Sequence, residues 1–165
     1  LNQGKLMGHP EIIEKYLNLA VNMPEKEVYM DLQSDLYLRV PGLILAEAFC
    51  VHTDVYVFYF SKYDHKKHCR AGHGAMNPYI FGNIEEDEEE ISLSEKLMGA
   101  WAAFIRNGNP WHERIPKWPA YDRRCRKIMV IDREWEIRQD YLWEQYELLA
   151  PFLEEGRRLM ELENE

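Results

Sequence analysis

Long apolar stretches are missing from this chain of 165 residues. The longest strongly apolar run covers residues 55–60, whereas a helix needs roughly 20 residues to span a bilayer. Basic side chains are also in deficit, because 20 Lys and Arg stand against 29 Asp and Glu, a formal net charge of −9. We therefore expect no membrane span, and no nucleic-acid partner that is bound by neutralising phosphates.

Cysteine is scarce, with Cys50, Cys69 and Cys125 at wide spacing. An odd, dispersed set is not a disulfide framework, and it fits a reducing compartment or cysteines buried in a core. The cytoplasm is slightly favoured on this ground. Hydrophobic residues still make up 46% of the chain, which is enough to build a core.

Acidic residues are concentrated in an unbroken run at residues 85–90. The run lacks the interleaved turn residues and ligand spacing of a calcium site. Like charges repel and extend a chain, so we expect this run to be a solvated loop.

Apolar periodicity predicts an α/β layer fold, rich in helices and with about two sheet strands. Buried-type strands are expected at residues 54–61 and 127–132. Helices are expected at 10–21, at 27–44 with a break at Pro41, at 92–107 and at 141–163. Ser92 and Glu95 form a capping-box pair, Gly108 supplies a left-handed end, and Pro151 and Gly156 are candidate interruptions of the last helix.

The segment GHGAMNPYIFGN, residues 72–83, resembles the catalytic-histidine motif of type-B carboxylesterases, the family that includes the cholinesterases. Other blocks resemble the same family in the same order, at residues 35–41, 55–59, 101–110 and 118–122. The resemblance covers about residues 11–153. It departs at Met76, where the family usually has Glu, and at Asn77, where an apolar residue is usual.

This resemblance implies the C-terminal part of an α/β-hydrolase fold, whose triad runs Ser, then Asp or Glu, then His along the chain. It identifies His73 as the triad histidine, which accepts the serine proton and returns it to the leaving alcohol. No serine of the chain is flanked by glycines as in Gly-x-Ser-x-Gly, and the glycine-rich oxyanion loop is absent. We expect residues 1–165 to be a single C-terminal segment, with serine, acid and oxyanion donors located before Leu1.

The expected function is therefore part of a serine carboxylic-ester hydrolase that is inactive as this segment alone. Its partners would be an ester bound by the full-length protein and the missing N-terminal portion. Exposed sheet edges make self-association a further expectation. The start at Leu1 is also compatible with residues 1–165 being a separately expressed fragment. No cofactor or metal is expected.

Two alternatives remain open. The cluster of His65, His68, Cys69 and His73 contains zinc-ligand residue types, but it lacks a second ligand pair and is interleaved with basic residues. A non-catalytic carboxylesterase-like interaction or scaffold domain is the other alternative. Met76 favours that alternative, and the presence of His73 argues against it.

Overall fold

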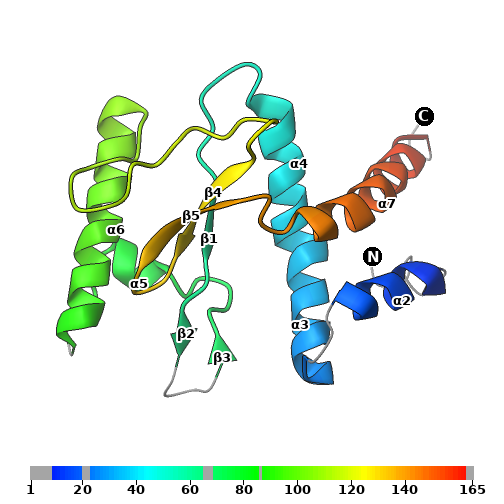
Figure 1. The fold of residues 1–165 in the computed structure, drawn as a ribbon, viewed down its shortest axis with the longest axis horizontal. Coiled ribbons are helices and arrows are strands. Elements are labelled where there is room, and N and C mark those ends of the chain that lie inside the picture. The colour runs from blue at the N-terminus through cyan, green and yellow to red at the C-terminus, as the bar shows by residue number, and fades with distance from the viewer. Residues whose placement is uncertain (1–8, 20–22, 65–68, 86, 163–165) are drawn as a thin grey trace. The chain divides into compact units, whose positions relative to one another are not determined.

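The structure, a computed structural model, describes residues 9–19, 23–64, 69–85 and 87–162 (Figure 1). The chain forms two compact units, with Leu1–Ala48 and Leu142–Glu165 in unit 1 and Phe49–Tyr141 in unit 2. Within the described ranges, every helix is too short or too polar to cross a bilayer.

A sheet of three strands organises unit 2 (Figure 1). Its order is β1 (Phe58–Phe60), β4 (Lys127–Ile131) and β5 (Trp135–Gln139). β1 and β4 run parallel, and β4 and β5 form an antiparallel pair. Parallel neighbours need a long crossover, and α5 (Asn77–Ile80) and α6 (Glu88–Asn107) lie within it.

Both expected strands are present, but the first is shorter than residues 54–61, because regular pairing begins only at Phe58. The residues before it are still bonded, since the Val55 carbonyl accepts from the Tyr121 amide at 2.7 Å and the Val57 carbonyl from the Met129 amide at 3.0 Å. β5 was not expected. Its polar residues interrupt any apolar run, and only Trp135 among its five residues is buried.

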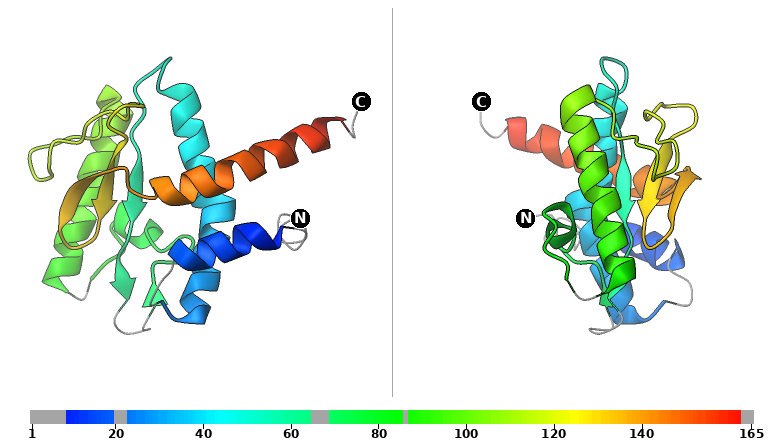
Figure 2. Two further views of the ribbon diagram at one scale, coloured as in Figure 1. Left: turned by 45° about the vertical axis from the view of Figure 1, so that its right-hand side comes forward. Right: turned by 90° about the vertical axis from the view of Figure 1, so that its left-hand side faces the viewer.

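One face of the sheet packs against α6 (Figure 2). The parallel register places Phe58 beside Met129 and Phe60 beside Ile131, so these side chains share a face. Phe58 contacts Trp101 of α6 edge to face, with ring centroids 5.3 Å apart. The buried members of this apolar cluster are Leu93, Leu97, Ala100, Ile115, Trp118, Met129, Ile131 and Trp135.

The first turn of α6 overturns two expectations. The helix begins at Glu88 because the Asp87 carboxylate caps it, accepting the Glu89 amide at 2.9 Å. Ser92 and Glu95 therefore lie inside the helix and do not form its capping box. The acidic run is only partly loop, since its last three residues complement the positive end of the helix. The expected left-handed end at Gly108 is confirmed, with φ of 70°.

Unit 1 is helical. It contains α2 (Pro10–Leu19), α3 (Glu25–Ser34), a π-helical turn η1 (Asp35–Arg39), α4 (Val40–Phe49, except its last residue) and α7 (Trp143–Leu162). The break expected at Pro41 takes the form of η1, in which the Val40 amide bonds the Asp35 carbonyl five residues back. Pro151 and Gly156 both lie within α7, so neither interrupts that helix as expected. The apolar core includes Tyr16, Leu36, Val40 and Leu149.

Candidate active site

His73 lies in what we call the histidine loop, residues 62–79, which begins two residues after β1 ends at Phe60. β2 (Tyr63–Asp64) and β3 (Cys69–Arg70) pair antiparallel, and the Ala71 amide then donates to the Lys62 carbonyl at 2.8 Å. The chain thereby returns to the carboxyl end of β1 two residues before His73. Open parallel sheets bind their ligands at this edge, because loops from neighbouring strands converge there.

A series of tight turns presents His73. The Ala75 amide donates to the Gly72 carbonyl at 3.1 Å, and the Asn77 amide donates to the Gly74 carbonyl at 3.0 Å. Gly74 has φ of 76°, which favours glycine, and Pro78 lies in the first turn of α5. The His73 side chain is exposed and makes no hydrogen bond to any described residue, so its ring nitrogens can receive partners.

Met76 differs from the exposed His73 in its access to solvent. It is partly buried and packs against the apolar cluster beneath α6. The position that resembles the family's Glu therefore supplies an apolar anchor, while the neighbouring Asn77 is exposed. Polar ordering of the loop has to come from other residues.

Glu90 of α6 supplies that polar ordering. Its Oε1 lies 2.8 Å from the Lys62 ammonium, and its Oε2 accepts a hydrogen bond from the Tyr79 hydroxyl. Burial pushes the pKa of Glu90 upward, but the bonds from Lys62 and Tyr79 outweigh burial and hold the pKa below its usual range. Glu90 is therefore an ionised carboxylate that contacts both ends of the histidine loop. The sequence signal for it was its place in the acidic run.

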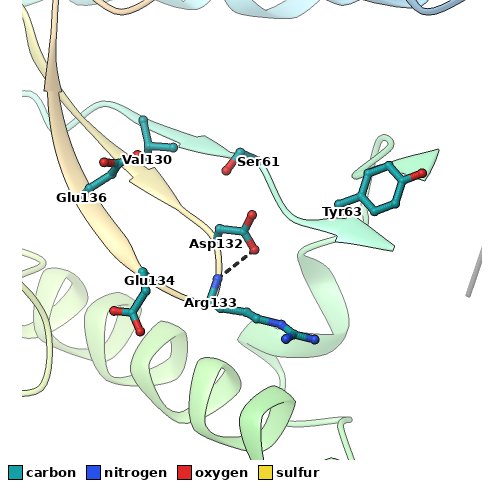
Figure 3. A pocket seen from close by; sticks show the side chains of 7 residues that line it. All are labelled: Ser61, Tyr63, Val130, Asp132, Arg133, Glu134 and Glu136. Atoms are coloured by element: carbon teal, nitrogen blue, oxygen red, sulfur yellow. Dashed lines mark hydrogen bonds between the residues drawn. The ribbon is translucent and has the colours of Figure 1, made fainter. Parts of the chain in front are cut away.

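A separate pocket of about 420 Å³ opens at the carboxyl edge of β1 and β4 (Figure 3). Within it the Arg133 amide donates to the Asp132 carboxylate at 2.8 Å. His73 is not among its lining residues, and none of them was a predicted site residue. They are Ser61, Tyr63, Val130, Asp132, Arg133, Glu134 and Glu136.

The hydroxyls of three of the four serines of the chain donate hydrogen bonds to backbone carbonyls. Ser34 donates to Met30, Ser61 to Ile131 and Ser94 to Tyr79, at 2.9, 3.3 and 2.7 Å respectively. None of them is paired with His73. The described arrangement therefore presents a candidate general base without a hydroxyl nucleophile.

The alternative metal cluster is not assembled by the described residues. His65 and His68 lie outside them, and only the backbone of Cys69 is described. Over the ranges that the structure covers, no group of three or more His, Cys, Asp or Glu side chains is arranged to hold a metal ion.

Comparison with known proteins gives a consistent family. A profile described as the carboxylesterase family matches residues 5–149. The para-nitrobenzyl esterase of Bacillus subtilis is 29% identical over 156 residues, covering 88% of this chain and 31% of that protein. Human cocaine esterase is 36% identical over 107 residues, covering 58% of this chain and 19% of that protein. The chain therefore spans less than a third of either relative's length.

Solved structures agree in fold. A structure named PNB esterase superposes with a TM-score of 0.71 at 28% identity, covering 84% of this chain and 30% of that one. A Geobacillus stearothermophilus carboxylesterase gives a TM-score of 0.69 at 20% identity, covering 84% of this chain and 31% of that one, a likeness of fold alone. The expected fold class, part of an α/β-hydrolase, is confirmed, with three strands in the main sheet rather than two.

Proposed function

The chain belongs to the carboxylesterase family, and from that premise we propose that it supplies the triad histidine, His73, to a serine carboxylic-ester hydrolase. The supporting observation is the placement of His73, exposed on a loop that returns to the carboxyl end of β1. A serine hydroxyl is a weak nucleophile, so it needs a base at such an edge. His73 takes the serine proton during attack on the ester carbonyl and then protonates the departing alcohol.

We place the nucleophile and the oxyanion donors of this hydrolase outside the 165 residues, because the chain contains neither a glycine-flanked serine nor a glycine-rich oxyanion loop. We propose that the acid lies outside them as well. The chain alone then lacks the group that forms the acyl intermediate, so it is inactive by itself. We expect residues 1–165 to cleave a p-nitrophenyl ester no faster than the His73→Gln variant does. Turnover of the isolated chain that is lost in His73→Gln would contradict this.

A chimera tests the role of His73 directly. Residues 1–165 replace the aligned segment of the Bacillus subtilis para-nitrobenzyl esterase, which contributes the missing portion. The chimera should hydrolyse para-nitrobenzyl esters, and His73→Gln should lower kcat by about 10³-fold or more. His52→Gln is the matched control, since His52 is also exposed in unit 2 and should leave kcat unchanged. An active chimera whose activity is unchanged by His73→Gln would refute the proposal.

A carboxylesterase-like interaction domain is the second candidate, and the apolar anchoring of Met76 favours it. In that function the histidine loop is retained as a structural element and no ester is cleaved. A folded, inactive chimera whose activity is not restored by Met76→Glu would support this second candidate over the hydrolase.

In the described part of the chain, the unpaired edge of β1 indicates what kind of partner the chain has. Among the described residues β1 pairs only with β4, which leaves its other edge open. Such an edge attracts a further strand. The portion of the hydrolase outside these residues is the proposed occupant, and a second copy of the chain takes its place when that portion is absent. Self-association of residues 1–165 in sizing experiments should therefore disappear in the chimera.

A further inference from the structure

We propose that Glu90 is a positioning residue for His73, and that its two carboxylate oxygens hold the two ends of the histidine loop on the first turn of α6. The inference rests on the proposed catalytic role of His73. The His73 side chain forms no hydrogen bond or ion pair with Glu90 in the described part of the chain. The proposed role of Glu90 assigns a function to part of the acidic run.

The first end of the loop is held through Lys62. Its ammonium lies 2.8 Å from Glu90 Oε1, with the two side chains only 12% and 18% exposed. An ion pair so shielded is screened less by water and salt than a surface pair is. The Lys62 carbonyl also accepts the Ala71 amide, so the residue that Glu90 fixes is bonded to the chain two residues before His73.

The second end is held through Tyr79, in α5. Its hydroxyl donates to Glu90 Oε2, and its carbonyl accepts the Ser94 hydroxyl at 2.7 Å. Ser94 lies one helical turn after Glu90, so the same face of α6 contacts Tyr79 twice. The Tyr79 ring packs against Phe60 of β1 with centroids 5.7 Å apart, and the Lys62 ammonium lies 5.8 Å from its centroid.

The chemistry of this clamp requires a carboxylate. Lys62 and Tyr79 both approach Glu90 as donors, and only an ionised carboxyl offers an accepting oxygen to each. A glutamine carries no charge and has one accepting oxygen, so it either loses the bond to the Lys62 ammonium or keeps that bond without the charge and reverses the direction of its bond with the Tyr79 hydroxyl. The charge of Glu90 is also favoured by the first turn of α6, where unpaired amides make the helix end positive.

Glu89 provides a matched control one residue away. It lies in the same first turn and carries the same charge, but it pairs with Arg133 at 2.9 Å. Arg133 belongs to the turn between β4 and β5, and the side chains of the pair are 52% and 64% exposed. Glu89→Gln therefore makes the same change of charge at the same helix end without touching the histidine loop.

The test uses NMR of the full 165-residue chain, uniformly labelled so that both the backbone amides and the histidine rings are observed. The His73 ring signal is assigned with His73→Gln, and hydrogen exchange is followed at the amides of Ala71, Ala75 and Asn77. In Glu90→Gln these amides should exchange about tenfold faster or more, equivalent to about 1.4 kcal/mol. The His73 ring signal should shift or broaden. Glu89→Gln should change neither, and the Leu97 and Met129 amides should stay protected in both variants.

Tyr79→Phe gives a second measurement if Glu90→Gln does not fold. It keeps the ring beside Phe60 and removes the hydroxyl that donates to Oε2, so it should release the Ala75 and Asn77 amides. Equal effects of Glu90→Gln and Glu89→Gln, or unchanged loop amides in both Glu90→Gln and Tyr79→Phe, would overturn the inference.

The same variants in the esterase chimera separate this inference from the proposed function. Loss of positioning should lower kcat at least tenfold while KM stays unchanged, because a displaced base weakens interactions made in the transition state. If the loop is released in Glu90→Gln but His73→Gln costs no activity, the clamp stands and the catalytic role of His73 fails. A KM increase at constant kcat would count against positioning.

Discussion

Asp35 should make unit 1 lose stability as the pH rises from acid to neutral. Its side chain is 1% exposed in η1, accepts the Tyr16 hydroxyl at 2.5 Å and lies 2.8 Å from the Arg39 guanidinium. Burial raises the pKa of Asp35 to about 6, and the charge of Arg39 and the bond from Tyr16 only partly oppose this. In the unfolded chain the carboxyl has its ordinary pKa of 3.8.

The direction of this pH dependence follows from the linkage between proton binding and folding. The folded state binds the proton more tightly, so this contribution to stability is complete below pH 3.8 and is lost as pH rises through about 6. About two pKa units at about 1.36 kcal/mol each give roughly 3 kcal/mol in total. About 2 kcal/mol of this falls between pH 4 and pH 7. Asp35→Asn stays neutral and keeps an oxygen for Tyr16, so it should remove this slope.

The measurement is urea unfolding of both proteins by circular dichroism at several pH values, taken as a difference between wild type and Asp35→Asn. Asp31→Asn is the matched control, because Asp31 also pairs with Arg39, at 2.9 Å, but is less buried. Its slope should stay close to that of the wild type. Carboxyl carbon NMR should give Asp35 a pKa near 6. Titration near 4 with parallel stability curves would refute the reasoning.

Further predictions concern the stability of unit 2, with Gly42 of unit 1 as one control. Leu97→Ala should lower its free energy of unfolding by about 2–5 kcal/mol, because Leu97 is fully buried against the sheet, and exposed Ile105→Ala should cost far less in the same denaturant titration. Gly99→Ala should lower the melting temperature, since a new Cβ would meet the His112 ring at 2.8 Å, whereas Gly42→Ala has open space in α4 and should not. Gly108→Ala should cost about 1 kcal/mol by urea unfolding because of its left-handed φ, and Gly108→Asn should cost less.

Local sequence patterns predicted most of the helices and both members of the parallel pair. Helical spacing of apolar residues marks a buried stripe, and an apolar run marks a strand covered on both faces. The helix boundaries expected at Ser92 and Pro151 were wrong for different reasons. Asp87 caps α6 before Ser92 is reached, and packing of α7 in unit 1 retains the helix through a proline that local propensity disfavours.

The candidate site likewise contains one residue that the sequence could identify and one that it could not. His73 could be found because its neighbours form a recognisable motif, and in the structure its loop returns to the carboxyl end of β1. Its role as a base stays a prediction. Glu90 could not be chosen from the acidic run, because its neighbours share its chemistry. Only folding brings Lys62 and Tyr79 to its two oxygens, while Glu89 turns to Arg133.

The sequence by itself determined most of the helical segments, both strands of the parallel pair, the left-handed end at Gly108 and the motif around His73, because each depends on residues close together in the chain. Tertiary structure alone decided that β1 lies beside β4, that Glu90 bridges the histidine loop and that Asp35 is buried with a raised pKa. These features join residues far apart in sequence, and their energies depend on distance and on the loss of water. Neither the distances nor the loss of water can be read from the local sequence.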